Sequence, residues 1–174
     1  QLHAEAGLEY AELLNSEGEC LLELKCHRLA APLFDLAHTA VCTAHGSDDA
    51  SVAAIEANQA AVLSAGGERA AAQELFGTSL ECIQASAVGL EEQQRQQQQR
   101  QQQRQQQGGE AQSEEESNLF MVQVMQARVL KLYAAHEEAP APGATHGDAQ
   151  TRQQHAKTLR AEAHRLETTY GFSS

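Results

Sequence analysis

The sequence predicts an all-α protein made of antiparallel helical hairpins, and an internal repeat is the main reason. Segment 30–37 returns 42 residues later as segment 72–79, with Leu-Phe on Leu-Phe and small residues on small residues. The same offset carries Gly-x-x-Leu at 18–21 onto Ala-x-x-Leu at 60–63. A fixed period of a few tens of residues is typical of stacked helical units, which bury their apolar faces only against their neighbours.

Composition supports the helical interpretation and limits the partners. The 174 residues are 41% hydrophobic, with no Trp and few other aromatics, so we expect one domain with a core built largely from Ala and Leu. Strands prefer β-branched and aromatic residues instead. The formal charge of -12, from 24 acidic and 12 basic residues, disfavours a nucleic-acid partner, because phosphate binding needs clustered Lys and Arg.

The first hairpin is predicted from apolar residues spaced three and four apart. Its first helix is expected over residues 3–24, where Gly18 marks a close approach by another helix. Its second helix is expected over residues 28–44, with Pro32 in the first turn, where the missing N–H does no harm. Gly46 then ends the helix.

The second hairpin repeats the first. Residues 47–49 (Ser-Asp-Asp) offer N-caps for a third helix that reaches about residue 65, and Gly66-Gly67 forms the turn. A fourth helix is expected over residues 68–88, with Gly89 at its end. Residues 1–90 therefore contain the first two hairpins.

A low-complexity insertion is predicted at residues 91–117. It is Gln-rich up to Gln107 and acidic at residues 114–116. It has no apolar face to hold it against a core, so we expect a disordered or frayed-helical loop, with a Gln-rich assembly tract as the alternative. Because Gln and Arg are fair helix formers, an outward extension of the fourth helix stays open.

The third hairpin is predicted within residues 118–174. Ser117-Asn118 is expected to cap a helix that runs to about residue 136, and a Pro/Gly loop at 139–148 separates it from a last helix over 149–170. The fifth helix is expected to turn these residues inward: Phe120, Val124, Ala127, Leu130, and Tyr133 or Ala134. In the last helix the small-large-small pattern returns as Ala156, Leu159 and Ala163.

These residues resemble the tetratricopeptide repeat, in which Leu-Gly and a large residue mark the first helix, and Ala, Phe and Ala mark the second. The residues that fit are Leu14, Gly18 and Leu21, then Ala30, Phe34 and Ala37. The 42-residue period is similar to the kinesin light chain variety, whose linker and Ala-Glu-Pro-Leu-Tyr stretch resemble segments 45–53 and 30–34. The resemblance implies a right-handed superhelix of about three hairpins, and the composition adds a Gln-rich insertion to it.

A partner peptide or helix is expected on the concave face, which the first helix of each hairpin lines. Four amide side chains there are able to donate and accept hydrogen bonds to a peptide backbone. The predicted partner-binding residues are Glu12, Asn15, Glu56, Asn58, Gln59, Val62, Gln123, Gln126 and Lys131.

Other chemistry finds little support in the sequence. His38, Cys42 and His45 fall on adjacent helical turns, and Cys26-His27 precedes them, so a Cys/His metal-binding domain stays an alternative. A closed zinc site needs a fourth ligand and usually a Cys-x-x-Cys pair, so we expect a buried Cys42 and no metal. No phosphate loop or catalytic motif is present, and we expect neither an enzyme nor a cofactor.

We therefore predict a protein-protein interaction scaffold or adaptor module. The alternative is an architectural subunit permanently buried in a large complex. The four cysteines lie within the predicted helical hairpins, which favours a reducing, cytoplasmic location. The chain starts at Gln1 and has no apolar run of signal or membrane-span length, so we expect an excerpt from a longer chain with no membrane partner.

Overall fold

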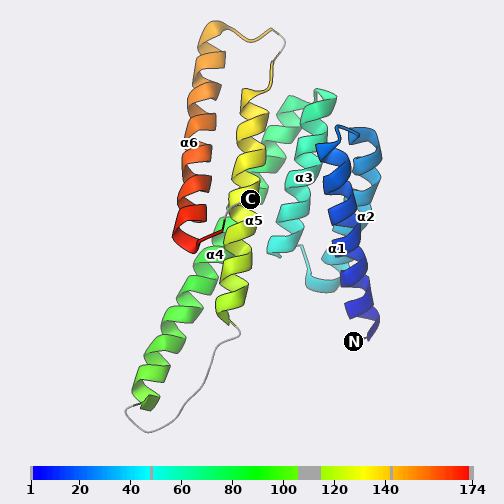
Figure 1. Ribbon diagram of the computed structural model, residues 1–174. Coiled ribbons are helices and arrows are strands. Elements are labelled where there is room, and N and C mark those ends of the chain that lie inside the picture. Colours follow the sequence, from blue (N-terminus) through cyan, green and yellow to red (C-terminus); the bar gives the residue numbers. More distant parts are fainter. Residues whose placement is uncertain (1, 48, 106–114, 142, 173–174) are drawn as a thin grey trace.

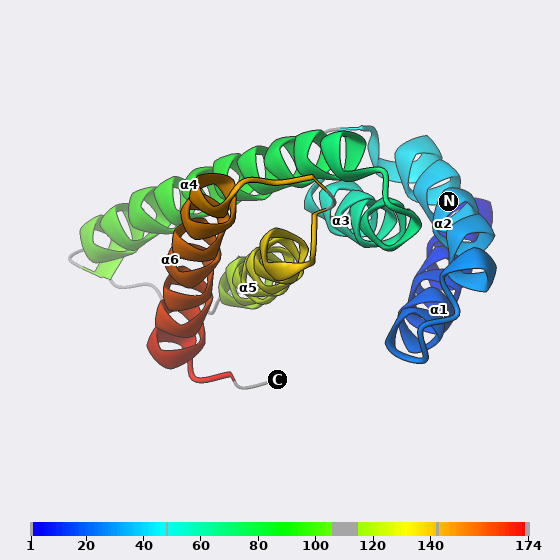
Figure 2. The same cartoon turned by 90° about the horizontal axis from the view of Figure 1, so that it is seen from above.

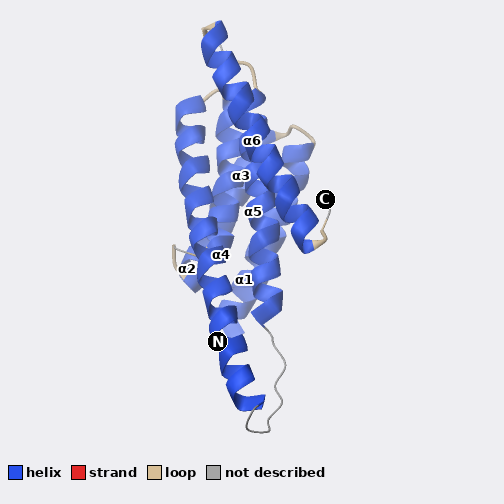
Figure 3. Ribbon diagram, turned by 90° about the vertical axis from the view of Figure 1, so that its left-hand side faces the viewer, coloured by secondary structure: helices blue, strands red, loops and turns tan. Residues whose placement is uncertain are grey.

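A computed structural model describes residues 2–47, 49–105, 115–141 and 143–172 (Figure 1). All regular secondary structure in these residues is helical, which confirms the all-α part of the predicted fold class (Figure 3). The helices are α1 (Leu2–Glu23), α2 (His27–His45), α3 (Ala50–Gly66), α4 (Arg69–Gln105), α5 (Glu115–Glu138) and α6 (His146–Tyr170).

The helices pack as three successive pairs. Within each pair, α1 with α2, α3 with α4 and α5 with α6, the two helices run antiparallel and make the most extensive contacts (Figure 1). Between pairs, α2 packs on α3, and α5 packs on both α3 and α4. Seen from above, the pairs follow one another from α1 and α2 at one end to α6 at the other (Figure 2). The helices α3 and α5 are therefore covered from several sides.

Local hydrogen bonds define several helix ends. The carboxylate of Asp49 caps α3 by accepting from the Ser51 N–H at 2.8 Å, so the predicted cap is confirmed at this residue. Gly67 closes α3 in the left-handed conformation, with φ of 88°, and its N–H donates to the carbonyl of Ser64. Thr145 starts α6 through a capping box with Asp148.

The predicted bounds of the fourth and fifth helices are wrong. Helix α4 does not end at Val88 but continues through Gly89 to Gln105, and α5 begins at Glu115, so Ser117-Asn118 lies inside it. Each added residue of a formed helix gains a hydrogen bond, while one exposed Gly costs only about 1 kcal/mol. The middle of the predicted insertion, residues 106–114, lies outside the described residues.

Two apolar clusters form the core. One joins α1, α2 and the start of α3 around Phe34, and the other joins α3 to α6 around Phe76. Both rings are fully buried, as the repeat predicts. A Cβ atom placed on Gly18 would lie 2.6 Å from Cε1 of Phe34, which confirms that this glycine permits a close approach between helices.

Candidate functional site

A polar network joins the first helices of all three pairs. Asn58 Nδ2 on α3 donates to Asn15 Oδ1 at 3.0 Å and to Glu19 Oε1 at 3.2 Å, both on α1. Arg128 on α5 pairs with Glu19 at 2.5 Å and donates to Asn58 Oδ1 at 3.4 Å. The structure thus brings two predicted residues together, but Asn58 is only 1% exposed and holds helices instead of facing a partner.

Sequence reasoning missed the charged members of this network. Glu19 lies four residues after Asn15, on the same face of α1, and its side chain accepts from Asn15 Nδ2 at 2.6 Å. Arg128 lies two residues after the predicted Gln126. The opposite charges of Glu19 and Arg128 were the only sequence signal for this network. They predict an ion pair only when α1 and α5 are known to lie close together.

A groove of about 510 Å³ lies next to this network, between α1, α5 and the C-terminal end of α6. Leu22, Val124, Leu132 and Phe172 give it apolar walls. Its charged lining comes from Glu19 with Arg128 and from Glu167, whose carboxylate lies 2.5 Å from Lys131 Nζ. Of the predicted residues, Lys131 therefore lines an open groove.

Three other predicted residues lie at the junction between the first two pairs. Glu56 Oε1 is 3.3 Å from His38 Nε2, and Gln59 Nε2 donates to Asp35 Oδ1 at 2.8 Å. Val62 packs against the apolar cluster of the first pair. Helix α2 occupies this side of α3, so these three side chains meet α2, and their role in binding a partner stays a prediction. Glu12 is exposed, beside Asn15 at the edge of this junction.

Two of the three residues predicted on the outward face of α5 are buried instead. Gln123 and Gln126 are only 3% and 6% exposed and lie among residues of α4 and α6, whereas Phe120, expected inside, is 39% exposed. Helix α5 contacts α3, α4 and α6, so little of its circumference is left for solvent. The Oε1 atom of Gln123 has no hydrogen-bond partner within the part of the chain that the structure describes.

The Cys/His residues do not converge on one point. Cys42 Sγ lies 3.7 Å from the ring of His38, but His45 turns toward Asp49, 3.4 Å away. Burial, and then the Glu56 carboxylate, raise the pKa of the Cys42 thiol, which disfavours the thiolate that binds metals. Within the described ranges no three His, Cys, Asp or Glu side chains gather as metal ligands.

The C-terminal end of α5 carries a second polar cluster that the sequence did not predict. The ring of His136 is buried, and its Nδ1 lies 2.8 Å from Ser64 Oγ. Arg69 donates to the carbonyl of His136 at 2.9 Å. Glu137 is buried beside it, and its carboxylate is 2.9 Å from His155 Nδ1. This cluster ties α3, α4 and α6 to the end of α5.

Acidification should destabilise the fold through His136. Burial, and then the positive charge of Arg69, lower the pKa of this imidazole, although Glu137 opposes them. The folded state therefore binds the proton less readily than the unfolded chain. The contribution of neutral His136 to the stability of the fold is therefore present above the unfolded pKa of about 6.5, and it is lost as pH falls below that value. Melting temperatures between pH 7.5 and 5.5 should fall less steeply for His136→Gln than for the parent.

A control keeps that measurement specific. His164 lies exposed on α6, and His164→Gln removes one imidazole without touching the buried cluster. We expect this variant to keep the parent's pH dependence. An equal flattening by both substitutions would show that the histidines act only through net charge.

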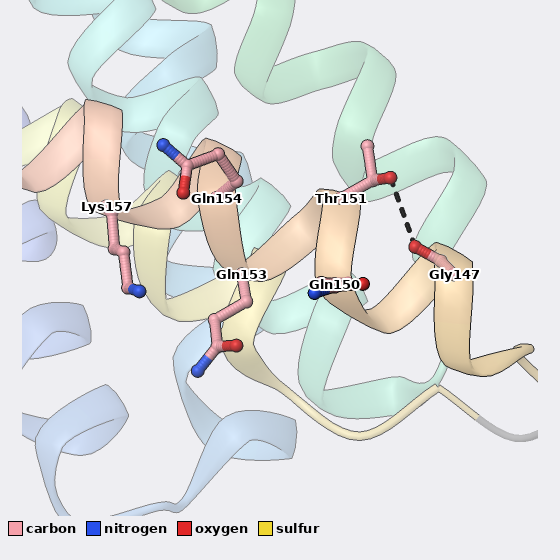
Figure 4. A pocket seen from close by; sticks show the side chains of 6 residues that line it. All are labelled: Gly147, Gln150, Thr151, Gln153, Gln154 and Lys157. Atoms are coloured by element: carbon pink, nitrogen blue, oxygen red, sulfur yellow. Dashed lines mark hydrogen bonds between the residues drawn. The ribbon is translucent and has the colours of Figure 1, made fainter.

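A hollow on α6 is not a candidate site. Its lining residues all come from α6 and succeed one another along a single helix (Figure 4). Thr151 Oγ1 is used locally, donating to the carbonyl of Gly147 at 3.1 Å, and the remaining polar lining, Gln150, Gln153, Gln154 and Lys157, belongs to the same helix. A specific site needs converging groups from more than one element.

Comparison with known proteins finds no relative: no family model, curated protein or solved structure matches the chain. In the described residues no helix has the length and apolar character needed to cross a membrane. The functional assignment therefore rests on the geometry of the chain itself, and the groove between α1, α5 and the end of α6 is the candidate site.

Proposed function

We propose that this chain is a tetratricopeptide-like adaptor module that binds an amphipathic peptide or helix in the groove between α1, α5 and α6. The observation that carries the proposal is the pairing of apolar walls with two ion pairs, Glu19 with Arg128 and Lys131 with Glu167. Apolar side chains supply the area that favours association, and charges beside them fix orientation and partner choice.

The dimensions of the groove favour a segment of protein. A volume of about 510 Å³ accommodates a few large side chains, as when anchor residues of an amphipathic helix enter a groove. Leu22 and Val124 approach from two different helices, so an apolar anchor would touch both walls. The first helices α1 and α5 are held apart by the network around Asn58, which keeps the groove open before a partner arrives.

The same arrangement favours binding over catalysis. The carboxylates of Glu19 and Glu167 are each held by a cation 2.5 Å away, which suits them to charge recognition more than to proton transfer.

All four cysteines are free thiols, two of them exposed, and this supports a reducing compartment such as the cytoplasm.

Peptides selected from a random library on the immobilised chain should bind through this groove. We expect Lys131→Glu, which breaks the ion pair with Glu167, and Leu22→Ser, which removes an apolar wall, each to weaken binding about tenfold. Isothermal titration calorimetry measures the affinities. Lys157→Glu is the matched control, because it makes the same charge change on the exposed face of α6. Peptides that bind the parent and all three variants with equal affinity would contradict the proposal.

A further inference from the structure

Exposed apolar side chains concentrate at one end of the molecule. Of the eight large apolar residues exposed in the described ranges, five belong to the first helix pair and its turn: Tyr10, Leu13, Leu24, Leu29 and Leu36. Tyr10 is 55% exposed and Leu13 is 63% exposed. At the other end of the molecule, α6 contributes none of the eight. Tyr10 and Leu13, three residues apart on α1, share one face of that helix, and exposed apolar side chains that share a face mark an interaction surface.

The packing of α3 against α2 shows how the first helix of a pair receives a helix from the preceding pair, and it serves as a template for α1. On α3, Val52 and Ile55 are 1% and 4% exposed because they pack into the cluster of the first pair, and Val62 packs at its edge. Gln59 lies in the same stripe and donates to Asp35 of α2 at 2.8 Å. These four residues form the side of α3 that receives α2.

The 42-residue repeat maps that stripe onto α1. Shifted back by one period, the four template positions fall on Tyr10, Leu13, Glu17 and Cys20, which we call the outer α1 face. All four residues are exposed. Asn15 and Glu19 turn to α3, so the outer α1 face points away from the second pair. Helix α1 thus presents the positions that receive a helix in the next pair, with no helix on them in the described structure.

We infer that the outer α1 face binds an amphipathic helix of a partner protein, which packs on α1 as α2 packs on α3 and places a Lys or Arg against Glu17. The cation is inferred from the template position at which Gln59 on α3 is replaced by Glu17 on α1. Gln59 meets an acceptor, Asp35, by donating from its amide. Glu17 is an acceptor with a negative charge, so its partner at that position has to donate and carry positive charge.

The surroundings of the outer α1 face select the same partner. Glu9 is exposed on α1 beside Tyr10 and four residues before Leu13, and Glu17 lies within the face, so the local field is negative. A second copy of this chain fits poorly, since its own outer α1 face is acidic and offers no cation to Glu17. Helix α6 of a second copy would offer the amides of Figure 4 and no exposed apolar side chain larger than alanine among the described residues. This surface is distinct from the groove of the proposed adaptor function and does not depend on it.

A synthetic helix with the sequence of α2 tests the inference. The probe is the peptide of residues 27–45 carrying Asp35→Lys, compared with the same peptide that keeps Asp35. Fluorescence anisotropy should show that the parent chain binds the lysine peptide at least about tenfold more tightly. In Glu17→Lys the preference should reverse, so that the aspartate peptide binds better. Leu13→Ser should weaken binding of the lysine peptide about tenfold, whereas Val88→Ser, at an exposed position on α4, should not.

The charge exchange separates this binding mode from its alternatives. A peptide that displaced the chain's own α2 would not respond to Glu17, because this residue is exposed and lies outside the α1–α2 contact that surrounds Phe34. Equal binding of both peptides, or the same affinity in Leu13→Ser as in the parent, would overturn the inference. So would a dimer of the parent in sedimentation that Leu13→Ser abolishes, since the occupant would then be a second copy. Circular dichroism melts of Leu13→Ser and Glu17→Lys should match the parent, because both positions are exposed.

Discussion

Replacing Phe76 with Ala should lower the free energy of unfolding by about 3 to 5 kcal/mol. The ring is fully buried, stacks on Tyr133 with centroids 5.1 Å apart and planes 9° apart, and lies 5.5 Å from the ring of His136. Truncation therefore removes contacts within the second pair and between the second and third pairs. Denaturant unfolding followed by circular dichroism measures the loss.

Phe34→Ala should fall in the same range, since that ring occupies the equivalent repeat position and is also fully buried. Phe120→Ala is the matched control. Phe120 is 39% exposed and its ring meets the edge of Phe172 near the chain's end, so we expect a loss under about 1.5 kcal/mol. If Phe34→Ala or Phe76→Ala melted within a degree or two of the parent, the repeat phase assigned to these helices would be incorrect.

The repeat predicted the interior of the first two pairs because each unit reuses the same contacts. Ala30, Phe34 and Ala37 lie inside one pair, and Ala72, Phe76 and Ser79 lie at the same positions in the next, all of them buried. A small-large-small stripe at helical spacing limits two closely packed helices to a small set of geometries, and each places the stripe inside. In α6 the stripe of Ala156, Leu159 and Ala163 is buried too, as predicted.

The binding face could not be predicted in the same way, because it depends on how many neighbours each helix has. The prediction that Gln123 and Gln126 face solvent assumes that α5 is amphipathic. Helix α5 is instead covered by α3, α4 and α6, and a helix surrounded by neighbours buries polar residues along with apolar ones. The groove lies between α1 and α5, and no local pattern in either helix indicates how far apart these two helices lie.

The Gln-rich segment shows the limit of composition as a predictor. Side chains are described in residues 91–100, where none joins the apolar core, as the lack of apolar residues implied, yet helical structure continues to Gln105. Propagation of an existing helix needs good propensity and no new nucleus, and Gln and Arg satisfy that condition. The end of α4 therefore follows from the helix before it and not from the composition of the segment alone.

Gly18→Ala should destabilise the chain by about 1 to 2 kcal/mol, although alanine is the better helix former. The new methyl group would lie 2.6 Å from Cε1 and 2.9 Å from Cζ of Phe34, closer than carbon atoms approach in folded proteins. Phe34 is fully buried and cannot move into solvent, so α1 and α2 have to separate. Overpacking of this kind costs about 1 to 3 kcal/mol, against a propensity gain of about 1 kcal/mol.

Gly77→Ala on α4 isolates the clash from the propensity. No atom lies within 4 Å of a Cβ placed on Gly77, and its backbone is helical, so this substitution should stabilise the chain by about 0.5 to 1 kcal/mol. The two variants thus make the same chemical change with opposite expected signs in thermal and denaturant unfolding. The double variant Gly18→Ala with Phe34→Leu should recover part of the loss relative to the sum of the single changes, because the smaller side chain makes room for the methyl group. Stabilisation by Gly18→Ala alone would mean that α1 and α2 are farther apart than the ring of Phe34 requires.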